Sequence, residues 1–263
     1  MKSKAELMNR WGDILQETLE DLPNDYKRYE NPQQKVDDGF YSAMLHGAHR
    51  RIGVLDYLLN HNVIGFKENL RKAIPFKMEL LERYDKGDSI DLSRVSMVRF
   101  AELFDALALG DMNFAQSYAN LLGGRFEAEE MYDDEFVLSL GYSLKYAVEN
   151  NLEKLRLWLP RLKAFCENPK NSMSEFMDYP LVLEALLERD LEKANNAFQV
   201  LVSGHKKKCQ TYKGPDYGPF FRDSPDADLF VWGIGLANLC RYYGLNVQIL
   251  DYLIPEELLI PVS

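Results

Sequence analysis

Apolar residues recur at helical spacing around three short polar turns in the middle of the chain. When Asp111, Asn151 and Asp190 are taken as equivalent turn positions, the repeats are separated by 40 and 39 residues. Positions one, four, seven, eight and eleven after each turn are apolar or aromatic, and so are positions three, four, seven and eleven before it. This spacing places the side chains on one face of a helix. We therefore predict three antiparallel helical hairpins, each of which must pack against a neighbour to bury its apolar face.

A weaker hairpin precedes these three. It begins with an apolar-rich helix at 50–60 and continues into Val63, Phe66 and Leu70. Pro75 is expected to interrupt its second helix, because proline lacks the amide donor that the helix interior needs. The N-terminal third of the chain is therefore also predicted to be helical.

Prolines and a strand-like segment are the exceptions to the helical pattern. Pro160 is expected to kink its helix, while Pro180 suits a first turn and makes Asp178 a candidate N-cap. The segment 247–253 is the one strand candidate, and Asp251 weakens it. We therefore predict an all-α fold.

The predicted architecture is a solenoid-like stack of antiparallel helical hairpins with a period of about 40 residues and an N-terminal helical portion. A single domain covers 1–263. Within it, we expect N-terminal helices at 1–90, the hairpin repeats at 91–204, and a long loop with a C-terminal capping helix at 205–263.

Composition and charge exclude several functions. The chain carries 31 Lys and Arg against 41 Asp and Glu, a net charge of −10, which opposes non-specific binding of nucleic acid. Its longest apolar stretch, 229–240, is shorter than the ~20 residues that a membrane-spanning helix needs. The acidic, amphipathic start does not resemble a secretory signal, and three distant cysteines indicate neither a disulfide framework nor a zinc site. We expect a cytoplasmic protein that binds neither nucleic acid nor membrane.

Few residues suggest catalysis or metal binding. His46 and His49 could ligate a metal from one helix face, but no third ligand is evident, so a surface or capping pair beside Arg50 and Arg51 is expected. The basic run 206–208 is expected to be the solvated end of a helix that stops near residue 204. We predict that the chain is not an enzyme, and we assign no catalytic residue, metal or cofactor.

A dense acidic cluster is the first feature that indicates binding. The stretch 111–135 holds seven carboxylates and one arginine, a net charge of −6. Helix capping explains two or three of the acids, and a solvated connector is the alternative to a binding role. Concentrated like charge also steers a cationic partner. The predicted partner-binding acids are Glu127, Glu129, Glu130, Asp133, Asp134 and Glu135.

The aromatic connector 210–226 is the second such feature. It is a long segment in a chain of short turns, and its aromatic side chains could anchor it to the core or act as interface hot spots. We include Tyr217, Phe220 and Phe221 among the predicted partner-binding residues. The aromatic-rich surface could also support a homodimer.

The tail and the turn motifs resemble a known family. The tail reads DADLFVWGIGLANLCRYYGL at 226–245 and IPEELL at 254–259, and Leu109-Gly110-Asp111 stands upstream, with Phe114-Ala115 and Leu121-Leu122. Together these resemble the all-α immunity proteins of bacterial polymorphic toxin systems, most closely immunity protein family 49. The resemblance implies an immunity protein that binds and silences a co-encoded toxin, often one delivered by contact-dependent or type VI secretion.

The acidic cluster suggests how such a protein would act. Many toxins are nucleases with basic grooves, so an acidic surface could occlude the active site of a cationic toxin. The alternative is a tetratricopeptide-like adaptor or secretion chaperone that binds peptides or effector proteins in a concave groove. No repeating ligand-facing residue is evident at equivalent positions of the repeats, which favours the immunity function.

Overall fold

Helices are the only regular secondary structure in the part of the chain that the structure describes. A computed structural model describes residues 3–31, 38–168, 176–211 and 224–262. No β-strand occurs in these ranges, and the strand candidate 247–253 contains none, so the all-α prediction is confirmed. The residues form two compact units, 1–95 and 96–263. Within the described ranges, no helix is long and apolar enough to cross a membrane.

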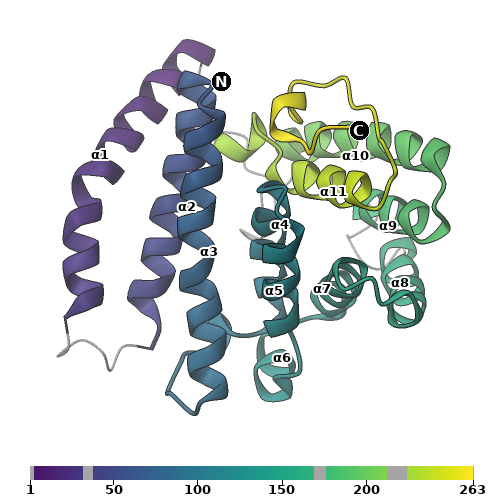
Figure 1. Cartoon of the computed structure of the whole chain (residues 1–263), viewed down its shortest axis with the longest axis horizontal. Helices are drawn as coiled ribbons and strands as arrows, with labels where there is room; N and C mark the ends of the chain where they lie inside the picture. The colour runs from purple at the N-terminus through teal and green to yellow at the C-terminus, as the bar shows by residue number, and fades with distance from the viewer. Residues whose placement is uncertain (1–2, 32–37, 169–175, 212–223, 263) are drawn as a thin grey trace. The chain divides into compact units, whose positions relative to one another are not determined.

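The first unit contains three long helices that lie side by side (Figure 1). They are α1 (Lys4–Glu30), α2 (Phe40–Asn60) and α3 (Val63–Asp85), followed by the short 3-10 helix η2 (Leu92–Arg94).

The second unit contains eight α-helices, most of them shorter, and three 3-10 turns among the described residues (Figure 1). In chain order they are η3 (Met97–Phe100), α4 (Ala101–Ala108), α5 (Met112–Leu121), α6 (Phe126–Tyr132), α7 (Glu135–Val148), α8 (Leu152–Glu167), α9 (Asp178–Glu188), α10 (Leu191–Thr211), η5 (Pro225–Ala227), α11 (Val231–Tyr242) and η6 (Glu256–Leu258).

The predicted turn positions share one local structure. Asp111, Asn151 and Asp190 each accept a hydrogen bond from the backbone N–H three residues later, at 3.2, 3.2 and 3.0 Å. They therefore cap the second helix of each hairpin. The residue before each cap has a positive φ: Gly110 at 73°, Asn150 at 54° and Arg189 at 57°. A left-handed residue followed by a capping side chain thus reverses the chain in two residues.

The α2–α3 pair uses the same turn. His61 has a φ of 53°, and the Asn62 side chain caps α3 by accepting from the Gly65 N–H at 2.8 Å. The fourth hairpin is therefore present. Its predicted interruption at Pro75 is wrong, because α3 continues through the proline, whose ring is exposed. Helix α8 likewise continues through the exposed Pro160.

The predicted apolar faces form a large part of the core of the second unit. All the residues four, eight and eleven after each turn are buried, and so are those four, seven and eleven before it. The other positions are less uniform. At position one Met112 is buried but Leu191 is 41% exposed, and Trp158 and Leu187 are half-buried. Hairpin partners pack against each other in the pairs α4–α5, α7–α8 and α9–α10.

The basic run 206–208 is not a solvated helix end. Helix α10 continues to Thr211, and Lys208 is buried with its Nζ 2.8 Å from Asp178 Oδ2. A Cβ at Gly204 would overlap the same carboxylate, so this glycine permits the close approach of α9 rather than ending α10. Asp178 is likewise not the predicted cap, because Met177 occupies the N-cap position of α9.

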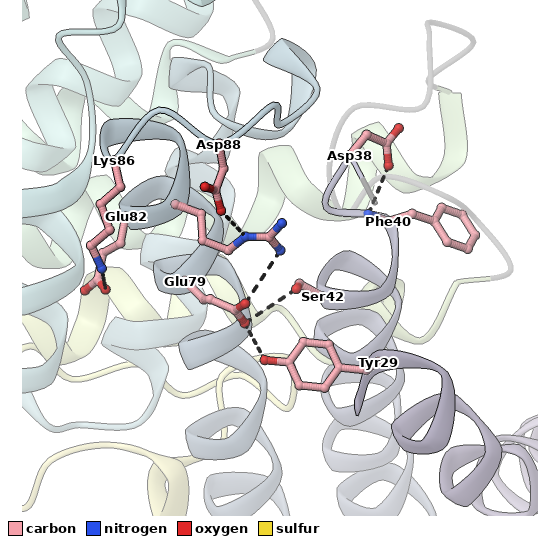
Figure 2. A network of polar contacts seen from close by, with 9 residues as sticks. Tyr29, Asp38, Phe40, Ser42, Glu79, Glu82, Lys86 and Asp88 are labelled. Atoms are coloured by element: carbon pink, nitrogen blue, oxygen red, sulfur yellow. Dashed lines mark hydrogen bonds and ion pairs between the residues drawn. The ribbon is translucent and has the colours of Figure 1, made fainter. Parts of the chain in front are cut away.

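A polar network joins the three helices of the first unit. Tyr29 on α1 donates its hydroxyl to Glu79 on α3 at 2.6 Å, and Ser42 on α2 donates to the same carboxylate at 3.5 Å (Figure 2). Arg83 lies between Glu79 at 3.7 Å and Asp88 at 2.9 Å. The C-terminal end of α1 is thereby tied to both neighbouring helices.

Candidate functional site

The six predicted acids lie on α6, on the two residues after it and on the first residue of α7. They differ sharply in exposure. Glu129 is buried, Asp133 and Glu135 are half-buried, and Glu127, Glu130 and Asp134 are exposed. Their structural surroundings separate those that hold the fold together from those that remain available to a partner.

Glu129 is buried and serves to hold the fold together. It is 6% exposed, and the Tyr142 hydroxyl donates to both of its carboxylate oxygens at 3.0 Å. The Arg125 N–H donates to the same carboxylate at 3.3 Å. Burial beside this carboxylate raises the pKa of Tyr142 to about 12, so the hydroxyl stays protonated and remains a donor. Glu129 therefore fastens α6 to α7.

Asp133 also serves the fold. Its two carboxylate oxygens accept hydrogen bonds from the backbone N–H groups of Met97 at 2.6 Å and Val98 at 3.0 Å. The carboxylate therefore caps the N-terminus of the 3-10 helix η3. Desolvation raises the pKa of Asp133, and the two backbone donors oppose that shift. Its carboxylate is directed into the fold, away from any partner.

Asp134 and Glu135 are each engaged in an interaction within the fold but remain partly exposed. Asp134 is the N-cap of α7 and accepts from the Val137 N–H at 2.8 Å. Glu135 forms a bidentate pair with Arg161, with both N···O distances at 2.9 Å, and Arg161 lies 4.2 Å from the ring centroid of Trp158. The pair is about half exposed, so its net charge towards a partner is small.

Glu127 and Glu130 remain as exposed acids, and exposed apolar residues surround them. Phe126 is 79% exposed, Met131 62% and Tyr132 48%. At about 100° per residue, Phe126, Glu130, Glu127 and Met131 cover one continuous arc of α6. We call Phe126, Glu127, Glu130 and Met131 the α6 surface. By the same rotation Tyr132 falls between Ala128 and Glu129, outside this arc.

The opposite side of α6 explains why these side chains point outward. Ala128 and Glu129 occupy that side and are buried. Before the helix, Gly123 and Gly124 adopt φ values of 79° and 80°, a left-handed turn that redirects the chain after α5. The Arg125 side chain donates to the Leu121 carbonyl at 2.8 Å, which closes this turn.

Large exposed apolar residues beside acids are the feature that the sequence pattern did not reveal. The repeat pattern defines helices only around the three turns, and 126–132 lies outside it, in the acidic stretch between the first and second hairpins. Aromatic and methionine side chains are enriched at the centres of protein interfaces. The α6 surface thus has the composition of a protein-binding patch with a negative rim.

The aromatic residues Tyr217, Phe220 and Phe221 lie outside the described residues.

The prediction for the two histidines is corrected by the structure, because both side chains are buried. His46 and His49 are 6% and 3% exposed, so the expected surface or capping pair is wrong.

His49 belongs to a core network of the first unit. It lies 2.7 Å from the Tyr26 hydroxyl and 3.2 Å from Asn69 Oδ1, and burial lowers its pKa. Within the described part of the chain, no group of three or more His, Cys, Asp and Glu is arranged to hold a metal ion.

Comparisons with known proteins identify no relative. No protein-family model matches the chain, and neither a curated protein nor a solved structure matches it. The candidate site therefore depends on the geometry and composition of the α6 surface.

Proposed function

We propose that this protein is a bacterial immunity protein that binds a co-encoded toxin and neutralises it by covering its active site. The α6 surface would make the central contact, and the toxin would present a basic groove. The chain would act as a binding protein without catalysis. It would work in the cytoplasm, a compartment that suits its three buried cysteines.

The observation that carries this proposal is the exposure of two large apolar side chains, Phe126 and Met131, on either side of two carboxylates on α6. Burying such side chains at an interface supplies affinity, while the carboxylates favour a cationic partner and raise the association rate. Glu129 supports the surface from below, so α6 need not fold on binding.

The scaffold we propose behind this surface is a solenoid-like stack of hairpins. Three hairpins pair internally, α7 also contacts α5 and α9, and α8 contacts α9. A rigid stack suits an inhibitor that must bind before its toxin acts. The same scaffold would suit a peptide-binding adaptor, and the experiment below separates the two functions.

The test is binding and protection with variants of the α6 surface. Phe126→Ala combined with Met131→Ala should weaken binding of the co-encoded toxin at least tenfold, because hot-spot truncations cost about 2 kcal/mol or more. Ile64→Ala is the matched control, since Ile64 is 70% exposed on another helix. Affinity is measured by calorimetry, and protection by growth of cells that express the toxin.

A co-encoded toxin that binds wild type and the α6 variant equally would refute the role of this surface. A toxin that does not bind at all would refute the immunity function. Recovery of many unrelated extended peptides in place of one toxin would identify the adaptor.

A further inference from the structure

A groove of about 670 Å³ runs between α1 and α2 in the first unit. It does not involve the α6 surface and does not depend on the function proposed for that surface. Helix α1 lines one wall with Glu17, Asp21 and Asp25, which follow one another at intervals of four residues. They therefore form a row of carboxylates along one face of the helix.

The other wall differs in chemistry. Helix α2 contributes small or apolar residues, among them Ala43, Met44, Gly47 and Ala48. A Cβ built on Gly47 would have no heavy atom within 4 Å, so open space lies above this glycine. The groove thus has an acidic wall and an apolar floor.

Arginines lie at the two ends of the groove, and most are already paired. Arg28 lies 3.5 Å from Asp25, and Arg94 lies 3.7 Å from Asp38. Arg51, also among the lining residues, is exposed at the end where α1 contributes Glu17. This leaves Glu17 and Asp21 as the acids with the greatest freedom to meet a ligand, and Arg51 as the cation.

The groove is held open by contacts elsewhere on α1. Tyr26 is hydrogen-bonded to His49 on α2, and Tyr29 donates to Glu79 on α3, as Figure 2 shows for the second pair, so α1 is tied to both neighbouring helices. The cavity is therefore a preorganised feature of the unit.

We propose that this groove binds an amphipathic basic helix of a partner protein. The apolar side of that helix would cover Met44 and Gly47, while Lys or Arg side chains one turn apart would meet Glu17 and Asp21. Arg51 would donate hydrogen bonds to the free carbonyl groups at the C-terminal end of the helix, where the partial charge is negative. Burying an amphipathic helix in a preformed groove is a common mode of recognition.

The test uses the full chain and a synthetic probe, an N-acetylated helical peptide of about 15 residues with leucines on one face and lysines on the other. Saturable binding is expected by fluorescence anisotropy. A second peptide keeps the lysines and replaces the leucines by serines, and a third replaces the lysines by glutamates. Both should bind at least about tenfold more weakly, since the groove requires the apolar face and the positive charge.

Two pairs of variants locate the binding. Gly47→Leu fills the floor and should weaken binding about tenfold or more, whereas Gly12→Leu adds the same side chain at another helical glycine with open space and should not. Asp21→Lys should weaken binding similarly, while Glu20→Lys, an exposed neighbour outside the groove, should not. Thermal unfolding checks that each variant folds.

The proposal is overturned if the leucine–lysine peptide shows no saturable binding. It is equally overturned if Gly47→Leu leaves the affinity unchanged, or if the control variants weaken binding as much as their partners. Failure of this experiment would not count against the role proposed for the α6 surface, because the two experiments use different ligands and different residues.

Discussion

At the scale of single residues, His205 is a titratable side chain that the fold keeps away from solvent. Its Nε2 lies 3.1 Å from the carbonyl oxygen of Asp226, and its ring stacks on Phe230 with the centroids 3.9 Å apart. Burial lowers the pKa of His205 to about 4. The folded state therefore holds a neutral imidazole, and protonation opposes folding.

We predict that His205 makes the protein sensitive to mild acid. A depressed folded-state pKa gives stability that is present above the unfolded pKa of 6.5 and is lost as the pH falls towards 4. Two pH units in this window correspond to a loss of about 2 to 3 kcal/mol in the free energy of unfolding. Urea denaturation at about pH 6.5 and about pH 4.5 measures it.

His205→Gln is the comparison variant, because it keeps an amide donor for Asp226 but does not titrate. It should lose less stability than the wild type over the same interval. His49 also has a lowered pKa, but it is present in both proteins and cancels in the difference. An equal loss in both proteins would contradict the assignment to His205.

The acids show where residue-level reasoning from sequence ends. The cluster itself was visible, and capping was expected to use two or three of its members. Local sequence could not show that Glu129 is fastened by Tyr142, thirteen residues away, or that Asp133 caps a helix that begins at Met97. Likewise, a run of three lysines resembles a solvated end until Asp178, 30 residues away, is seen to pair with Lys208.

At the scale of elements, the recurring device is the two-residue turn between paired helices. The capping side chain offsets one unsatisfied N–H of the second helix, and the left-handed residue before it reverses the chain. Asn150, Arg189 and His61 adopt this conformation without being glycine, with φ values of 54°, 57° and 53°.

We predict that the caps stabilise their hairpins measurably. Asn151→Ala should lower the free energy of unfolding by about 1 kcal/mol, because the Lys154 N–H loses its acceptor. Asn196→Ala is the matched control: Asn196 is exposed in the interior of α10, where alanine is the better helix former, and the change should be neutral or slightly stabilising. Chemical denaturation gives both values, and equal destabilisation would exclude a special role for the cap.

The elements were the most predictable part of the molecule. A period near 40 identified the turns at Asp111, Asn151 and Asp190, because each repeat must bury the same face. The prolines were less informative: α3 and α8 both continue through them on exposed faces, where the missing amide bond and the ring are tolerated. The short helix α6 escaped notice because it lies outside the repeat, between the first and second of these hairpins.

At the scale of the whole molecule, the effect of the net charge of −10 on a binding partner depends on where the individual charges lie. Of the six clustered acids, Glu129 and Asp133 are committed to the fold, Asp134 caps a helix and Glu135 is paired. Reversing all six would therefore unfold the region as well as remove the charge. Any test of electrostatic steering must confine itself to Glu127 and Glu130.

Our last prediction is that binding of a cationic toxin depends on where the negative charge lies and not only on its total. Glu127→Lys with Glu130→Lys raises the net charge from −10 to −6, and so does Asp13→Lys with Glu68→Lys, two exposed acids on other helices. Raising the salt concentration from about 50 to about 500 mM should slow association of the wild type by screening. The first double variant should associate slowly with a flat salt dependence, while the second should stay close to the wild type. Stopped-flow association measures both slopes. If the two double variants behave alike, the net charge alone steers the encounter and the α6 surface has no special part in it.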